Sequence, residues 1–259
     1  MDTTNSRMLR TRLDALAIEF GLRKLPRIPR PVIADSRLYP FIPYLAMSQG
    51  RGCMGFGATP GERTANISSF VYSDAYNSMS ESMGACSVDV EELRNAVSMV
   101  GDEKLRRNLE SLLARCDSLH GRAIILSEAG TSQAADRQSS MFYHELVHML
   151  LLHNRVCPPA GSSTASRWRK FCEGLAIFMQ HYFEEYGARS MAFVKAYAEG
   201  KENGSQFYEY AMYASRIGRV FERARTPEAR RAAISRLLPN KNGQNKQNLS
   251  HNFGDNRRN

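Results

Sequence analysis

The chain has 259 residues, of which 42% are hydrophobic, and a formal net charge of +9 at pH 7. This length can bury one substantial core, and the sequence has no run of about 20 apolar residues, which argues against a membrane-spanning helix. The first 30 residues contain no apolar signal-peptide core, and the five cysteines show no C-x-x-C spacing. These features predict reduced thiols in a cytoplasmic protein, or in an effector that is delivered to a host cell without a cleavable signal.

The N-terminal half alternates between helical and loop-rich segments. Residues 1–30 are predicted to form an N-terminal helix, over residues 8–25, and a Pro-rich linker with the sequence PRIPRP. Residues 31–80 are expected to be rich in loops, and helical periodicity dominates residues 88–120. The short apolar run at residues 123–126 precedes the polar stretch SEAGTS, so it predicts a strand followed by a loop.

The segment MFYHELVHML, residues 141–150, contains two histidines four residues apart. In a helix, predicted here over about residues 137–154, His144 and His148 project from one face about one turn apart, which is the spacing that a zinc ion needs. Glu145 lies beside the first histidine, where it can act on a metal-bound water without being a ligand. An amphipathic helix with two unliganded histidines is the alternative. The apolar surroundings favour metal binding, because these side chains are costly to bury without a partner.

A catalytic zinc site takes three protein ligands and keeps a fourth position for water, so a third ligand is expected downstream. The pattern H-E-x-x-H-x-x-G-x-x-H is absent, since Asn154 stands where its last histidine would be. The better candidate is Glu173, near the start of a second apolar-periodic helix predicted over about residues 168–183. Small residues at Gly174 and Ala176 would let this helix approach the first one closely. A carboxylate that interacts with the helix dipole is the alternative for Glu173.

The H-E-x-x-H motif, followed about 25 residues later by E-G-L-A at residues 173–176, resembles the gluzincins. These are the thermolysin-like zinc metallopeptidases, in which a glutamate on a second helix is the third ligand. The resemblance implies that His144, His148 and Glu173 bind Zn²⁺ and that Glu145 is the general base.

The same resemblance implies a fold. We expect an α+β, mostly helical chain, with a zincin-like catalytic domain over residues 31–238 that combines a small N-terminal sheet with a helical C-terminal part. The sequence departs from some gluzincins at Ile177, where these have an aspartate that orients the first histidine. The hydrogen-bond partner of His144 must therefore come from elsewhere.

Gluzincins often have a later tyrosine or histidine that donates a hydrogen bond to the tetrahedral oxyanion. The segment QFYEYAMYASRIGRVFER is similar to the Y-x-x-A helix of several of these peptidases. This similarity favours Tyr208, three residues before Ala211, with Tyr210 as the second candidate. Tyrosines at helical spacing also pack with the ring in the core, which is the alternative for both residues.

The C-terminal region is predicted to be helical over residues 189–199, 206–225 and 227–238, and the Asn-rich tail over residues 239–259 is expected to be disordered. Arginines crowd the last two of these helices, at Arg216, Arg219, Arg223, Arg225, Arg230, Arg231 and Arg236. They indicate a basic surface, although the sequence contains no recognisable nucleic-acid module.

Two function classes follow. The first is a zinc-dependent metallopeptidase that hydrolyses a protein or peptide substrate through a zinc-activated water. The alternative is a non-catalytic zincin-fold protein that uses its basic surface to bind an acidic protein or a nucleic acid. Glu145 favours the enzyme, because a purely structural zinc site needs no base at that position.

Overall fold

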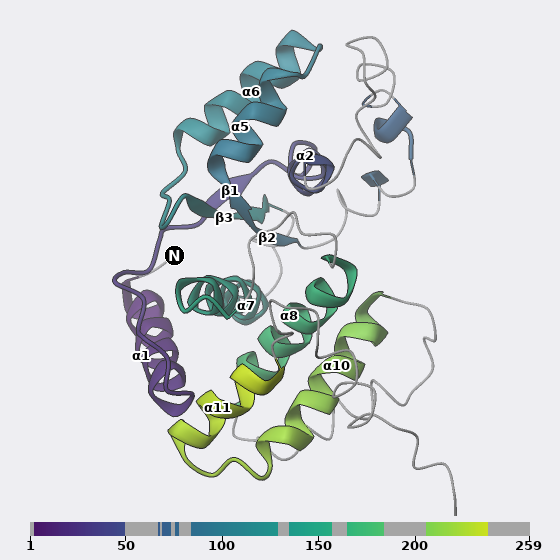
Figure 1. Cartoon of the computed structure of the whole chain (residues 1–259). Helices are drawn as coiled ribbons and strands as arrows, with labels where there is room; N and C mark the ends of the chain where they lie inside the picture. Colours follow the sequence, from purple (N-terminus) through teal and green to yellow (C-terminus); the bar gives the residue numbers. More distant parts are fainter. Residues whose placement is uncertain are drawn as a thin grey trace, which may run out of the picture.

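The computed structural model describes residues 3–49, 67, 69–73, 76–77, 84–128, 135–156, 165–183 and 206–237. The predicted helix over residues 189–199 and the predicted disordered tail over residues 239–259 lie outside these ranges. In chain order (Figure 1), the elements are α1 Thr3–Glu19, β1 Val32–Ala34, α2 Phe41–Gln49, β2 Ala85–Asp89, α5 Val90–Ser98, α6 Glu103–Ala114, β3 Arg122–Ser127, α7 Ala135–His153, α8 Ala165–Gln180, α10 Gln206–Phe221 and α11 Pro227–Leu237.

The strands form a three-stranded sheet in the order β1-β3-β2. Strand β1 pairs in parallel with β3, with Ile33 opposite Leu126, and β2 pairs antiparallel to β3, with Cys86 opposite Ile125. The apolar run of residues 123–126 is fully buried in the central strand, as its composition predicted. A strand that is apolar on both faces must be covered on both faces, and this determines the layers around it.

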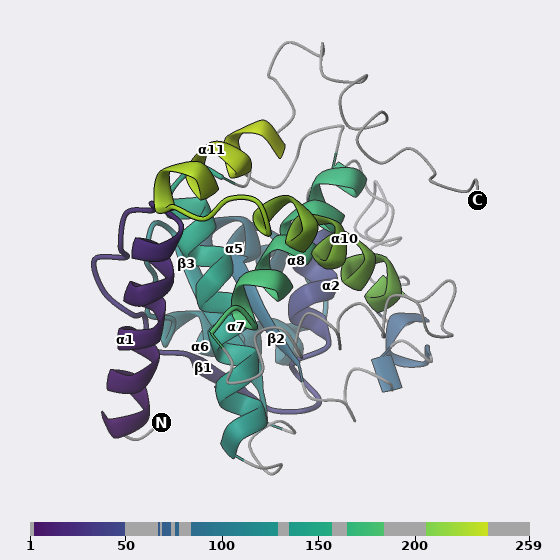
Figure 2. The same ribbon diagram turned by 90° about the horizontal axis from the view of Figure 1, so that it is seen from below.

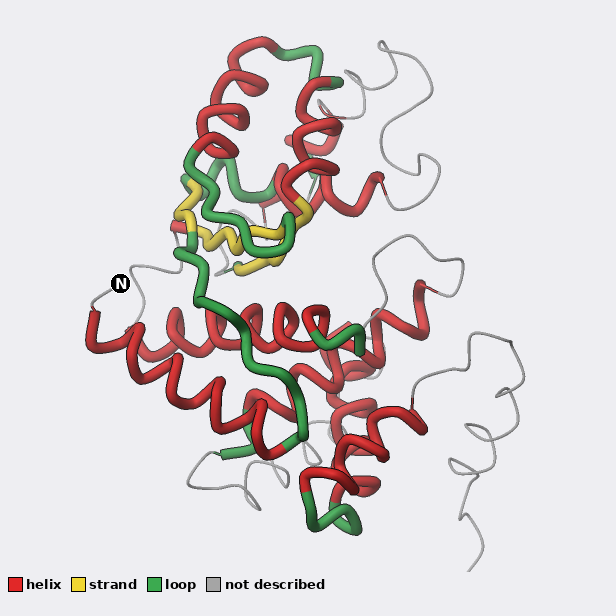
Figure 3. The backbone as a smooth tube through the Cα atoms, turned by 60° about the vertical axis from the view of Figure 1, so that its left-hand side comes forward, coloured by secondary structure: helices red, strands yellow, loops and turns green. Residues whose placement is uncertain are grey.

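Two layers of helices cover the two faces of the sheet (Figures 1 and 3). Ile125 of β3 packs in a cluster with residues of α2, α5 and α6. Ile124 and Leu126, whose side chains point to the opposite face, pack in a second cluster with residues of α1, α7, α8, α10 and α11. We call these the α2–α5–α6 layer and the α7–α8 layer, and the predicted metal ligands belong to the second.

Helices α5 and α6 begin at aspartate caps. Asp89 accepts hydrogen bonds from the backbone N–H groups of Glu91 and Glu92, each at 3.0 Å, and Asp102 accepts one from Leu105 at 2.8 Å. The prediction that helix begins at residue 88 was wrong, because residues 85–89 pair with β3 and the helix starts only after the Asp89 cap.

Helix α1 is part of the core of the α7–α8 layer. Its buried apolar face includes Leu13 and Leu16, and Phe20 just beyond its end makes edge-to-face contacts with Phe178, at a centroid distance of 6.1 Å, and Phe221, at 5.2 Å. At the other end of the chain, Arg230 of α11 forms an ion pair with Glu19 of α1 at 2.6 Å. In the view from below, α11 lies beside α1 and α10 lies beside α8 (Figure 2).

The fold class is α+β and mostly helical, as predicted. No described helix is both long and apolar enough to cross a membrane. Among the described cysteines, Cys86 and Cys116 are free thiols, whereas Cys172 is disulfide-bonded. The prediction of reduced thiols was therefore wrong for Cys172, because the sequence spacing of cysteines says nothing about pairs that only the tertiary fold brings together.

Candidate metal centre

Helices α7 and α8 bring the three predicted ligands into one group. Among the described residues, His144, His148 and Glu173 are the one set of three such side chains that could hold a metal ion. Nε2 of His144 lies 3.1 Å from Nε2 of His148 and 3.4 Å from Oε2 of Glu173, and Nε2 of His148 lies 3.3 Å from the same oxygen. The spacing of four residues on α7 aligns the histidines, and the packing of α8 against α7 supplies the carboxylate.

The three distances match the edges of a tetrahedron of zinc ligands. Metal–ligand bonds of about 2.0–2.1 Å at tetrahedral angles place neighbouring donor atoms roughly 3.3 Å apart. The separations of 3.1, 3.3 and 3.4 Å lie close to this value. Two imidazole nitrogens and one carboxylate oxygen are also a donor set that catalytic zinc uses. The residues therefore fit a zinc ion by both distance and chemistry.

The ligand group is accessible to solvent. The side chains of His144 and His148 are each 18% exposed, and that of Glu173 is 26% exposed. A structural zinc site is usually closed by four protein ligands, whereas a catalytic site keeps one position for water or substrate. In the part of the chain that the structure describes, the group offers three ligands and has solvent access.

The electrostatics of the group favour an ionised carboxylate among the histidines. Burial would raise the pKa of Glu173, but hydrogen bonds with His144 and His148 lower it well below the usual range of a glutamate. For His144, burial would lower the pKa, but the hydrogen bond with Glu173 and the negative charges of Glu145 and Glu173 raise it above its usual value. The site thus presents negative charge where a cation would bind.

The sequence did not identify the hydrogen-bond partner of His144, and the structure does. Nδ1 of His144 lies 3.0 Å from Oε1 of Gln180, the last residue of α8. Gln180 follows Glu173 by seven residues, which is two helical turns, so both side chains lie on one face of α8. Its position could have been found by extending the search one turn beyond Ile177.

Glu145 is next to the ligand group and is not a member of it. It is 8% exposed, and its charge contributes to raising the pKa of His144. Burial raises the pKa of the Tyr39 hydroxyl, and the charges of Cys86 and Glu145 raise it further. Tyr39 packs against Gly84, directly before β2. The charge of Glu145 therefore acts both on His144 of the ligand group and on Tyr39, which lies against the residue before β2.

Gly174 allows a close approach of two helices, but not of the two that were predicted. A Cβ atom at Gly174 would lie 2.5 Å from Cβ of Tyr213 and 2.9 Å from the backbone nitrogen of Ala214, both on α10. Four residues on, Phe178 of α8 stacks on Phe221 of α10, at a centroid distance of 5.2 Å. Gly174 thus brings α8 against α10, and the prediction that it brings α8 against α7 was wrong.

The predicted oxyanion residues both lie on α10. Tyr210 is buried, with 7% of its surface exposed. The side chain of Tyr208 lies outside the described residues. Their role stays a prediction. Tyr213, one turn beyond Tyr210, lies directly opposite Gly174, which is the residue after the ligand Glu173.

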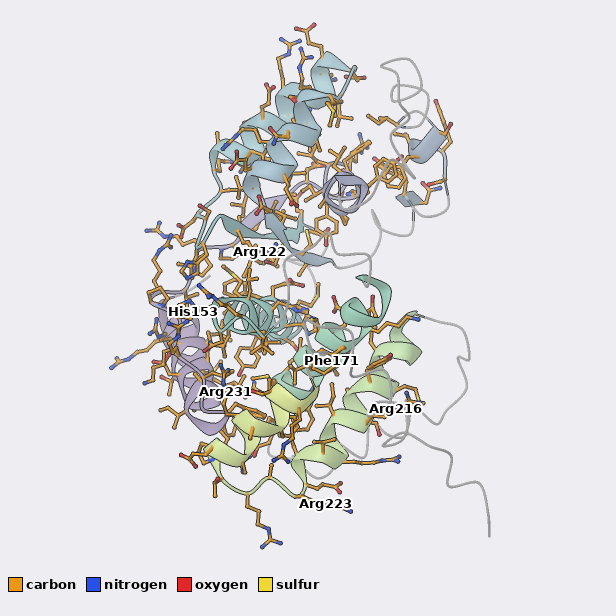
Figure 4. The ribbon with its side chains drawn as sticks, in the orientation of Figure 1. Arg122, His153, Phe171, Arg216, Arg223 and Arg231 are labelled. Carbon is orange, nitrogen blue, oxygen red and sulfur yellow. The ribbon has the colours of Figure 1, made fainter. Side chains whose placement is uncertain are left out.

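Of the seven C-terminal arginines, Arg216, Arg230 and Arg231 are partly buried and the other four are exposed. Arg230 pairs with Glu19 and so joins α11 to α1. The guanidinium of Arg216 lies 5.9 Å from the centre of the Tyr213 ring, one turn earlier on the same helix. The exposed arginines lie on α10, in the turn after it and on α11, namely Arg219, Arg223, Arg225 and Arg236. Figure 4 labels Arg223, in the turn after α10.

Comparisons of the chain with protein-family models, with curated proteins and with solved structures gave no match. What can be said of its function therefore depends on the geometry and chemistry of the site.

Proposed function

We propose that the chain is a zinc-dependent metallopeptidase of the gluzincin type, with a zincin-like arrangement of sheet and active-site helices. The observation that carries this proposal is the convergence of His144, His148 and Glu173, whose donor atoms are separated by tetrahedral-edge distances. The ligands come from two helices that are well separated in the sequence, so chance along one helix does not account for the group.

A zinc ion held by these residues would supply Lewis acidity and would lower the pKa of a coordinated water toward about 7. The protein residues have separate roles around it. Glu145, a buried residue that directly follows His144, takes a proton from the attacking water and returns it to the leaving amine. Tyr208 or Tyr210 of α10 donates a hydrogen bond to the oxygen that becomes negatively charged. The predicted reaction is hydrolysis of a peptide bond in a protein or peptide substrate.

The experiment compares wild type with Glu145→Gln. Elemental analysis of both purified proteins is expected to give about one zinc per chain, because Glu145 is not a ligand. Cleavage of a proteome-derived peptide library is expected in the wild type and to fall by at least roughly 10²-fold in Glu145→Gln, since a general base typically contributes that much. Glu110→Gln is the matched control, because Glu110 is an exposed α6 residue.

Equal cleavage by wild type and Glu145→Gln would contradict the proposal. Zinc binding without any cleavage would favour the alternative, a non-catalytic zincin-fold protein. The specific observation for that alternative is the set of exposed arginines on α10, α11 and the turn between them. It predicts salt-sensitive binding to an acidic protein or a nucleic acid.

A further inference from the structure

The amide of Gln180 has a fixed orientation. Its Nε2 donates hydrogen bonds to the backbone carbonyl of Ser140 at 3.0 Å and to the Ser140 hydroxyl oxygen at 2.7 Å. An amide nitrogen has two hydrogens, and both are used by these two acceptors. The oxygen Oε1 is therefore the atom that faces Nδ1 of His144, at 3.0 Å.

This orientation determines the proton of His144. An amide oxygen only accepts hydrogen bonds, so Nδ1 of His144 must carry the hydrogen that it donates to Gln180. The hydrogen bond of the other nitrogen with Glu173 requires a doubly protonated ring, whereas in a neutral imidazole that nitrogen has a free lone pair. That nitrogen, Nε2, is the atom that points to His148 and Glu173. The tautomer imposed by Gln180 is thus the one that a metal requires.

A residue of the N-terminal helix holds Gln180 in turn. The guanidinium of Arg12, on α1, donates a hydrogen bond to the backbone carbonyl of Gln180 at 3.0 Å. Gln180 ends α8, where carbonyl groups lack partners within the helix and a positive charge is favourable. The same guanidinium lies 4.7 Å from the centre of the ring of Tyr143, the residue before His144 on α7. Arg12 therefore contacts both helices that carry the ligands.

We propose that Gln180 is a positioning residue that holds His144 in the Nδ1–H tautomer with Nε2 ready to bind a metal, and that Arg12 braces this arrangement from α1. Helix α1, which contributes no ligand, is on this account part of the metal centre. The inference depends on the metal-binding half of the proposed function and is independent of peptide hydrolysis.

The first test measures the tautomer directly. ¹⁵N NMR of the imidazole nitrogens in the metal-free wild type is expected to show His144 protonated at Nδ1, at a pH where the ring is neutral. In Gln180→Leu, which removes the acceptor, the signals are expected to shift toward the Nε2–H tautomer, whereas Gln180→Glu, which keeps an acceptor oxygen, is expected to retain Nδ1–H. A wild-type His144 protonated at Nε2 would overturn the proposal, whatever the stability of the variants.

The second test measures zinc affinity by competition with a chromogenic chelator. We expect Gln180→Leu to bind zinc roughly 10–100-fold more weakly than wild type, the usual effect of removing a hydrogen bond to a histidine ligand. Gln180→Glu is expected to recover most of the affinity. A folded Gln180→Leu protein with wild-type affinity would overturn the proposal.

The third test separates the bracing role of Arg12 from a general effect on α1. Arg12→Met is expected to weaken zinc binding by roughly 10-fold, at the lower end of that range. The matched control is Arg10→Met, since Arg10 is on the same helix and pairs with Asp14 of α1 at 3.0 Å. Equal zinc affinities of the two variants would overturn the role of Arg12.

The outcomes distinguish this inference from the proposed function. Weaker zinc binding in Gln180→Leu together with no peptide cleavage by the wild type would support the positioning role and contradict the peptidase. Cleavage by the wild type together with unchanged zinc affinity in Gln180→Leu would do the reverse.

Discussion

The two layers of helices that cover the sheet differ in what they bury. Among the described residues, the α2–α5–α6 layer has an apolar interior, with Leu93 of α5 and Leu109 and Leu112 of α6 fully buried. The buried polar side chains in the helices, or directly after one, are all in the α7–α8 layer, namely Glu145, Asn154, Gln180 and Ser215. Buried polar groups cost stability unless they are hydrogen-bonded. Their concentration in one layer therefore indicates that this layer contains the functional site.

Not every buried polar group in the α7–α8 layer belongs to the metal centre. The Asn154 side chain accepts a hydrogen bond from the backbone N–H of Arg23 at 2.7 Å and donates to the carbonyl groups of Arg23 and Leu150, each at 2.9 Å. It ties the segment after α1 to the end of α7. The α2–α5–α6 layer therefore has a structural role alone, whereas the α7–α8 layer has both structural polar contacts and the metal centre.

The largest effect is expected from removing a ligand. Glu173→Ala should lower zinc affinity by roughly 10²–10³-fold, since the free energy of zinc binding is shared among only a few ligands. The metal-free variant should remain folded, as judged by circular dichroism. Glu222→Ala, at an exposed position after α10, is the control. Unchanged zinc affinity in Glu173→Ala would break the comparison, because the polar layer would then contain no metal centre.

A matched pair of core substitutions sharpens the comparison. Leu112 of α6 and Leu146 of α7 are both fully buried, and each change to Ala should reduce the free energy of unfolding by about 3 kcal/mol, measured by urea denaturation of the metal-free protein. Only Leu146→Ala, between the two histidines on α7, should also weaken zinc binding by the folded protein. If Leu112→Ala weakened it equally, the two layers would not be functionally distinct.

A smaller effect is expected from the cap of α5. Asp89→Ala should reduce the free energy of unfolding by about 1 kcal/mol, because the side chain caps two backbone N–H groups. Asp89→Asn keeps an acceptor oxygen and should lose much less. Zinc affinity should be the same in both variants. A change in zinc affinity would show that the α2–α5–α6 layer influences the metal centre.

The smallest effect concerns a surface clamp that depends on pH. The hydrogen bond from Arg27 lowers the pKa of Asp117, burial opposes this, and the backbone N–H of Arg30 lowers it further. Because the folded pKa lies below the unfolded value, the clamp stabilises the protein above that value, and the contribution is lost as the pH falls through the folded pKa. Asp117→Asn should lower the melting temperature by no more than a few degrees at pH 7. The difference from wild type should disappear in acid, and a constant difference would contradict this account.

Local patterns predicted the parts of the site that helical periodicity determines. The spacing of His144 and His148 needs only one helix, and Glu173 was identifiable as a carboxylate among apolar neighbours on a second helix. Gln180 was missed because the search for a partner of His144 ended at Ile177, one turn too early. It lay within reach of the same periodicity argument.

Other features depend on contacts that no local pattern contains. The electrostatic coupling of Tyr39 to Glu145 joins residues more than 100 positions apart, as does the Arg12 contact with Gln180. The disulfide at Cys172 and the partner helix of Gly174 are likewise properties of the tertiary structure. The apolar run that contains Ile124, Ile125 and Leu126 did indicate a strand, but the two layers of helices that the sheet separates became visible only in the fold.

The contact at Gly174 sets the spacing between two helix axes, because a hydrogen atom is the largest substituent that fits there. The methyl group of an alanine at this position would push α10 away from α8. The neighbouring carboxylate of Glu173 would shift with the distorted turn of α8. Gly174 thus determines the distance between α8 and α10 next to the third ligand, Glu173.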